Sequence, residues 1–234
     1  MSIPIHFAPL QGYTDDVYRR IHHTLVGGIN TYYTPFLRME GGSVRSKDMR
    51  DIRPEFNNDI PVVPQIILKS MKEFEFLTSV VEEKGYSRID INMGCPFPMQ
   101  AKHGRGSGLL AKVNIIEEMA QEIARKTHLK FSVKMRLGWE NKDEWRPVLE
   151  ILNQIPLEQI TIHPRIGVQQ YKGEVWMEAF DEFYALCKHP IIYNGDVTSI
   201  KDIQNLEEKY PKLAGVMIGR GLLTRPSLAS EYVT

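Results

Sequence analysis

The chain has few cysteines, no long apolar run and no excess of either charge, and each absence narrows the class of protein. Only two of the 234 residues are cysteines, Cys95 and Cys187, and they form no CxxC pair. This usage argues against a disulfide framework or a structural zinc site and predicts a reducing, cytoplasmic setting. No stretch approaches the roughly 18 consecutive apolar residues of a membrane-spanning helix, so no membrane partner is expected.

The charges balance, and common nucleotide and metal motifs are missing. Lys and Arg number 29, as do Asp and Glu, so a nucleic-acid partner would need a local basic patch. The most charged stretch, residues 38–53, is predicted to be a solvated loop, with phosphate contact as the alternative. GxxxxGK[ST], GxGxxG and HExxH do not occur, and we expect no metal.

Short apolar runs alternate with helical periodicity along the whole chain. The predicted strands are 5–10, 29–35, 62–68, 88–94, 131–137, 159–164, 190–196 and 215–221. The predicted helices are 71–84, 113–127, 141–155, 176–187 and 199–210. This alternation predicts one (β/α)₈ TIM barrel over residues 1–234, with an open doubly wound sheet as the alternative. The polar segment 36–61 shows no clear helix, and residues 222–234 leave room only for a short or truncated eighth helix.

The most informative segment runs from Ile89 to Pro96. Its alternation predicts a buried strand that presents Cys95 at its C-terminal tip, although a free cysteine is often just a small core residue. The glycine-rich residues 104–108 follow and are interpreted as a flexible lid.

Barrel active sites lie at the C-terminal ends of the strands, so the polar residues there are candidates. Asn194-Gly195-Asp196 and Gly219-Arg220-Gly221 end the seventh and eighth strands, where many barrels bind phosphate; ordinary turns are the alternative.

Two further candidates lie on the fifth and sixth predicted strands. An inward Lys134 needs an anionic partner, either a reduced flavin or a neighbouring carboxylate. His163 is a candidate hydrogen-bond or proton donor, or a structural histidine.

These residues, in this order, resemble the tRNA-dihydrouridine synthase family of FMN-dependent barrels. The resemblance spans essentially the whole chain. It rests on the segments 8–15, 92–96, 133–138, 163–165, 194–196 and 219–221 and on Gln65. One departure is Leu10, where the family usually has Met. The family also carries a C-terminal helical tRNA-binding domain that these 234 residues lack.

The resemblance implies a cofactor, a reductant and a substrate. FMN would lie across the barrel mouth, NADPH would reduce it, and a uridine of tRNA would be unstacked onto it. A hydride would pass from flavin N5 to C6 of uracil, and Cys95 would donate a proton to C5. The remaining site residues would have binding roles. The cofactor would contact Pro9, Leu10, Gln11, Gln65, Lys134, His163, Asn194, Gly195, Asp196, Gly219 and Arg220, while Asn92 and Arg165 would help orient the base.

Two other functions compete with this one. A flavin-dependent dehydrogenase of free pyrimidines, similar to the dihydroorotate dehydrogenases, uses the same C5–C6 bond. Phe97 stands where that group has asparagine, and His163 and Arg165 favour the tRNA enzymes. A non-catalytic RNA-binding barrel is the third reading, and the set Gln65, Cys95, Lys134 and Arg220 argues against it.

Overall fold

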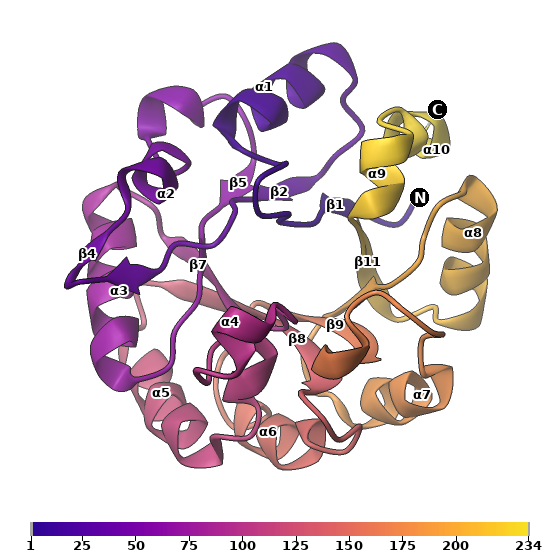
Figure 1. Cartoon of the computed structure of the whole chain (residues 1–234). Helices are drawn as coiled ribbons and strands as arrows, with labels where there is room; N and C mark the ends of the chain where they lie inside the picture. Colours follow the sequence, from indigo (N-terminus) through magenta and orange to yellow (C-terminus); the bar gives the residue numbers. More distant parts are fainter. Residues whose placement is uncertain (1, 234) are drawn as a thin grey trace.

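The computed structural model describes residues 2–233 as a barrel of parallel strands surrounded by helices (Figure 1). Met1 and Thr234, the two ends of the expected domain, lie outside the described residues. The sheet order is β5-β2-β1-β11-β10-β9-β8-β7-β6. These strands are β1 (Ile5–Phe7), β2 (Thr31–Tyr33), β5 (Val62–Val63), β6 (Gln65–Ile66), β7 (Arg88–Met93), β8 (Lys130–Gly138), β9 (Gln159–Ile166), β10 (Ile191–Asn194) and β11 (Leu213–Ile218).

The two ends of this order are consecutive pieces of one extended segment, and this closes the barrel. β5 pairs with β2 and β6 pairs with β7, so Pro64 marks the point where the sheet meets itself. Proline has no backbone N–H to donate to a ladder, which explains why the expected strand 62–68 is split here. The predicted barrel is confirmed, and the open-sheet alternative is wrong.

The helices follow the strands around the barrel, and most of them cover its outside (Figure 1). They are α1 (Asp16–Leu25), α2 (Ser46–Arg50), α3 (Met71–Glu83), α4 (Pro98–Ala101), α5 (Val113–Arg125), α6 (Trp145–Leu152), α7 (Met177–Leu186), α8 (Ile200–Lys209), α9 (Arg220–Thr224) and α10 (Leu228–Val233). The five predicted helices are confirmed as α3, α5, α6, α7 and α8, with somewhat shorter bounds. No helix within residues 2–233 is long and apolar enough to span a membrane.

The polar segment 36–61 is more ordered than predicted. It contains a hairpin of β3 (Met39–Glu40) and β4 (Ser43–Val44), then α2, then a 3₁₀ turn η1 (Pro54–Phe56). Asp51 is buried and forms an ion pair with the buried Arg19 of α1, at 3.6 Å between Nη1 and Oδ1, and Arg19 also donates to its backbone oxygen at 2.7 Å. The solvated-loop prediction for residues 38–53 is therefore wrong, because part of this charge is neutralised inside the protein by a distant helix.

The short α10 takes the place of the eighth barrel helix. It packs beside α8, and the Tyr232 hydroxyl accepts from the Ile3 N–H and donates to Glu207 (Figure 1). Gly28 has a φ of 77°, and a Cβ there would lie 2.4 Å from the Ser230 nitrogen. Only glycine therefore lets the loop after α1 approach α10 this closely.

A buried polar group lies within the barrel. The Gln159 amide donates to the Tyr33 hydroxyl at 2.6 Å, and this hydroxyl lies 3.4 Å from Nδ1 of His6. Burial, followed by the charge of Arg88, lowers the pKa of His6 from 6.5 to about 4. His6 is therefore neutral in the folded protein at pH 7.

This histidine should make the fold sensitive to acid. Between pH 6.5 and 4, His6 is protonated in the unfolded chain but stays neutral in the folded protein. The free energy of unfolding therefore falls as the pH falls. The loss attributable to His6 should reach about 3 kcal/mol near pH 4. Urea unfolding at several pH values should show a steeper acid loss for the wild-type protein than for His6→Gln. Parallel curves for the two proteins would contradict this.

Candidate active site

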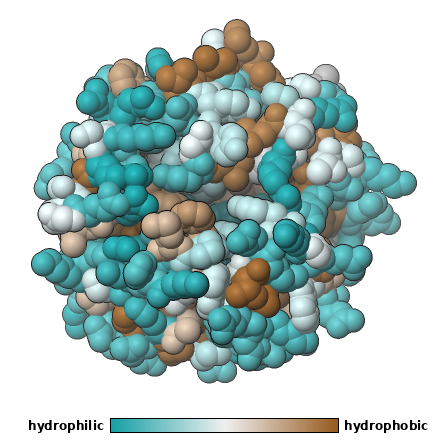
Figure 2. All heavy atoms as spheres, viewed as in Figure 1, coloured by the Kyte–Doolittle hydropathy of each residue, from teal (hydrophilic) through white to brown (hydrophobic). Residues whose placement is uncertain are grey.

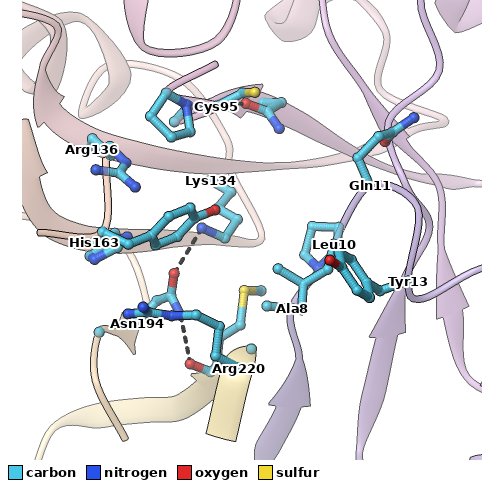
Figure 3. Close-up of a pocket in the computed structure, with 18 of the residues that line it drawn as sticks. Ala8, Leu10, Gln11, Tyr13, Cys95, Lys134, Arg136, His163, Asn194 and Arg220 are labelled. Carbon is cyan, nitrogen blue, oxygen red and sulfur yellow. Dashed lines mark hydrogen bonds between the residues drawn. The ribbon is translucent and has the colours of Figure 1, made fainter. Parts of the chain in front are cut away.

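A cavity of about 960 Å³ opens at the C-terminal ends of the strands. The face of the molecule around it is mostly hydrophilic, with scattered apolar patches (Figure 2). Gln11 and Leu10 lie across the cavity from Arg136 and His163 (Figure 3). The predicted site residues that line it are Pro9, Leu10, Gln11, Asn92, Cys95, Lys134, His163, Asn194, Gly195, Asp196, Gly219 and Arg220.

Two predicted residues lie behind the cavity wall. Gln65 has no exposed surface, and its Oε1 accepts from Nδ2 of Asn92 at 2.7 Å. Arg165 is buried and forms an ion pair with Asp196. Both side chains therefore act on the cavity through residues that line it.

The loop at the end of β7 fixes the backbone of Cys95 from both sides. Oδ1 of Asn92 accepts from the N–H groups of Gly94 at 3.0 Å and Cys95 at 2.8 Å. The Cys95 carbonyl accepts from the Ser107 N–H at 3.1 Å and from its hydroxyl at 2.9 Å. Burial raises the pKa of the Cys95 thiol, so the thiol carries its proton at neutral pH, and Cys95 lines the cavity.

The flexible-lid interpretation of residues 104–108 is wrong. Gly106–Leu109 forms a 3₁₀ turn, η2, whose residues are all buried. Glycine here permits close packing against the Cys95 loop. This segment therefore braces the thiol and does not cover the cavity.

Lys134 of β8 brings a buried ammonium group to the cavity. Its Nζ donates to Oδ1 of Asn194 at 2.8 Å, and Nδ2 of Asn194 donates to the Met217 carbonyl at 2.8 Å (Figure 3). Burial, followed by the charge of Arg136, lowers the pKa of Lys134 to about 8. Within residues 2–233, Lys134 makes no ion-pair contact. The charge of the buried Asp90 raises the pKa of Lys134 but does not offset the lowering, which favours an anionic ligand as a further partner.

Arg136 adds a second buried cation to the same wall. It donates to the Ile166 carbonyl at 2.9 Å and lies under the Tyr171 ring, 5.4 Å from its centroid. Its Nε is buried without a hydrogen-bond partner within the described residues. Lys134 and Arg136 are two residues apart on one strand, so strand alternation predicts their shared face. Tyr171 follows β9 in a loop, and no sequence pattern identified it.

One carboxylate serves two further arginines at the cavity edge. Asp196 accepts from Arg165 and Arg220, each at 2.9 Å, and the hydrogen bond from Arg165 is the main reason its pKa is lowered. Burial holds the pKa of His163 well below 6.5, so His163 is neutral, and its Nε2 accepts from Arg165 at 3.2 Å. With Lys134 and Arg136 included, positive charge exceeds negative charge around the cavity, which suits an anion.

Backbone donors lie beside these side chains. Within the described part of the chain, no acceptor takes the N–H groups of Gly195, Asp196, Gly219 or Arg220. Free amides next to Arg220 match the needs of a phosphate group. Residues 2–233 contain no cluster of His, Cys, Asp and Glu able to hold a metal ion.

The close packing of Gly106 can be tested by substitution. Gly106 has a φ of 57°, and an added Cβ would lie 2.7 Å from the Cys95 carbonyl oxygen. Gly41 has nearly the same φ, 56°, with no atom within 4 Å of such a Cβ. Gly41→Ala should therefore cost about 1 kcal/mol of unfolding free energy from backbone strain alone. Gly106→Ala should cost clearly more and change the rate of Cys95 alkylation. Equal effects of the two variants would show that the packing of Gly106 against the Cys95 loop is not tight.

Comparison with known proteins places these features in a context. The model of the family described as dihydrouridine synthase (Dus) matches residues 6–234. A Bacillus subtilis protein named "Probable tRNA-dihydrouridine synthase 2" is 31% identical over 226 residues, covering 94% of this chain and 69% of that protein. A Pseudomonas syringae protein named "tRNA-dihydrouridine(16) synthase" is 27% identical over 238 residues, covering 97% of this chain and 74% of that protein.

Solved structures share the fold at low sequence identity. A GH18 chitinase from Pseudoalteromonas aurantia superposes with a TM-score of 0.64 at 11% identity, covering 99% of this chain and 98% of the other. N-(5'-phosphoribosyl)anthranilate isomerase from Pyrococcus furiosus gives a TM-score of 0.57 at 12% identity, covering 100% and 96%. These similarities concern the barrel architecture alone.

Proposed function

The chain belongs to the dihydrouridine synthase family of FMN-dependent oxidoreductases, and on this premise we propose that it reduces uridine in tRNA to 5,6-dihydrouridine. The names of the relatives support tRNA as the substrate. We further propose NADPH as the reductant, reaching the cofactor through the open mouth, and the cytoplasm as the place of action.

The residues of the cavity fit FMN. Lys134 and Arg136 supply buried positive charge, and Arg136 has an unpartnered Nε. The free amides at 195–196 and 219–220, with Arg220, suit the phosphate. Pro9, Leu10 and Gln11 form the opposite wall. Bound FMN would supply the two-electron chemistry, by passing a hydride to C6 of the uracil ring.

Cys95 would provide the proton that completes the reduction. Its thiol is protonated at neutral pH and would transfer the proton to C5, leaving a thiolate that solvent reprotonates. Lys134 and Arg136 lower the pKa of this thiol through their charge, so they would stabilise the thiolate left behind. His163 is neutral and would accept a hydrogen bond without exchanging a proton.

One observation supports this function most strongly. A protonated thiol on a braced loop and an ammonium group that makes no ion-pair contact within residues 2–233 line the same cavity at the barrel mouth. The thiol supplies a proton at one point and the ammonium attracts a reduced, anionic cofactor at another. Reduction of an activated C=C bond requires both a proton donor and a stabilised reduced cofactor.

Replacement of Cys95 tests the proposal. Cys95→Ala should keep the visible spectrum of bound FMN but slow dihydrouridine formation by about 100-fold or more, because general acid catalysis contributes that much. Flavin reoxidation after anaerobic mixing with unmodified tRNA, with nucleoside analysis of the product, measures both steps. Cys187→Ala, which removes the cysteine outside the cavity, should leave the rate unchanged.

Three results would contradict the proposal. Full activity of Cys95→Ala would remove the acid role from this residue. Reoxidation of the reduced wild-type protein by orotate but not by tRNA would move the protein to the free-pyrimidine dehydrogenases. A protein that binds tRNA but takes up no FMN would be the non-catalytic barrel.

A further inference from the structure

We propose that Asp90, a carboxylate buried inside the barrel, is a positioning residue that fixes the direction of the hydrogen-bond chain holding Cys95. The inference deepens the proposed function, because it rests on the acid role of Cys95. Asp90 lies on β7, has no exposed surface and does not line the cavity. It therefore acts on the thiol only through other residues.

The chain runs from the barrel interior to the cavity wall through two amide side chains. Oδ2 of Asp90 accepts from Nε2 of Gln65 at 2.7 Å. Oε1 of Gln65 accepts from Nδ2 of Asn92 at 2.7 Å. Oδ1 of Asn92 then accepts from the N–H groups of Gly94 at 3.0 Å and Cys95 at 2.8 Å.

The two ends of this chain determine its direction. Backbone N–H groups can only donate, so Asn92 must turn its oxygen toward Cys95 and its nitrogen toward Gln65. Gln65 must then turn its oxygen toward Asn92 and its nitrogen toward residue 90. Residue 90 must therefore accept, and an ionised carboxylate is an acceptor at both oxygens. Reversal of one amide would place donor against donor or acceptor against acceptor at a buried position.

The surroundings of Asp90 agree with this role. Its other oxygen, Oδ1, accepts from the Ser132 hydroxyl at 2.6 Å, so both oxygens are used as acceptors. It forms no ion pair with Lys134, whose Nζ donates to Asn194. Burial raises the pKa of Asp90 to about 6, and the hydrogen bonds from Gln65 and Ser132 act to lower it, so the carboxylate is ionised at pH 7.5.

The chain can be reversed by a pair of substitutions that conserve its total charge. In Asn92→Asp alone, residue 92 still accepts from Cys95, but its second oxygen also needs a donor. Gln65 must turn, and its oxygen then faces the Asp90 carboxylate. Adding Asp90→Asn supplies a donor at that point and satisfies every link in the opposite direction. Asp90→Asn should therefore break a hydrogen bond in the wild-type protein but restore a fully bonded series of side chains in the Asn92→Asp variant.

The experiment uses the FMN-loaded protein in a Cys187→Ser background, where Cys95 is the only thiol. The limiting rate of iodoacetamide alkylation at high pH reports the position and the surroundings of Cys95, since the thiol is then ionised in every variant. Asn92→Asp and the double variant both carry the carboxylate at residue 92, so the difference between them reports the link at residue 90. Asn92→Asp should shift this rate by about tenfold, the effect of one mismatched buried link. The double variant Asp90→Asn/Asn92→Asp should recover most of the change in alkylation rate. Its unfolding temperature should be higher than that of Asn92→Asp. Ser132→Ala leaves one oxygen of Asp90 without its donor but touches neither amide of the chain, so it should change the rate less than Asn92→Asp does.

Outcomes separate this inference from the proposed function. If adding Asp90→Asn to Asn92→Asp leaves the alkylation rate and the unfolding temperature unchanged, or moves them further from the wild-type values, Asp90 is a buried charge without a positioning role. The proposal is then overturned. If the double variant recovers alkylation while uridine reduction proves independent of Cys95, the positioning stands and the acid role fails.

A second pair serves if Asn92→Asp does not fold. Gln65→Glu places two carboxylates face to face, and Asp90→Asn should rescue its stability and its alkylation rate; absence of rescue would equally overturn the proposal.

Discussion

An excess of buried positive charge over negative charge at the barrel mouth is the constraint on which the site depends. Lys134 is bonded to a neutral amide, and Arg136 to a carbonyl and an aromatic ring. Desolvated cations are unfavourable unless an anion or several hydrogen bonds compensate them. Hydrogen bonds to Asn194 and Ile166 offset part of this desolvation cost. An anionic ligand would offset the rest. What the folded chain leaves unsatisfied at this site is therefore what the proposed FMN would satisfy.

Barrel closure brings these charges together with the thiol. Parallel strands place their C-terminal ends on one face, so residues distant in sequence, such as Cys95 and Asn194, share one cavity. Behind that cavity, the polar residues Asp90, Gln65 and Ser132 replace the apolar filling common in such barrels. A fully bonded interior of this kind is rigid, because each amide has one satisfied orientation. Rigidity in the interior would keep Cys95 in place for the proposed proton transfer.

Much of the fold was predictable because its signals are local. Apolar runs ending in glycine, proline or polar residues identified the strands, and period-3.6 patterns identified α3, α5 and α8. The cavity residues were predictable for a related reason, since barrel topology determines where strand ends meet. Gly195 and Arg220 could be placed at the mouth from strand position alone.

What the sequence did not reveal depends on distant partners. The charge run 38–53 appeared solvated because nothing local shows that Arg19 reaches Asp51. Residues 104–108 suggested a lid because glycine serves both flexibility and close packing, and only the approach of Cys95 distinguishes them. Gln65 was expected at the flavin ring, yet its side chain is held behind the wall by Asp90 and Asn92.

The central claim is that uncompensated charge at the mouth holds and tunes the cofactor, and the reduction potential of bound FMN tests it most directly. Lys134→Met removes the buried ammonium group. Lys130→Met removes an exposed lysine at the other end of the same strand and is the matched control. Lys134→Met should lower the potential by about 30 mV or more, which corresponds to about tenfold weaker binding of reduced FMN relative to oxidised FMN, because the reduced anionic flavin loses its partner. Lys130→Met should match the wild type. An unchanged potential and affinity in Lys134→Met would contradict the account.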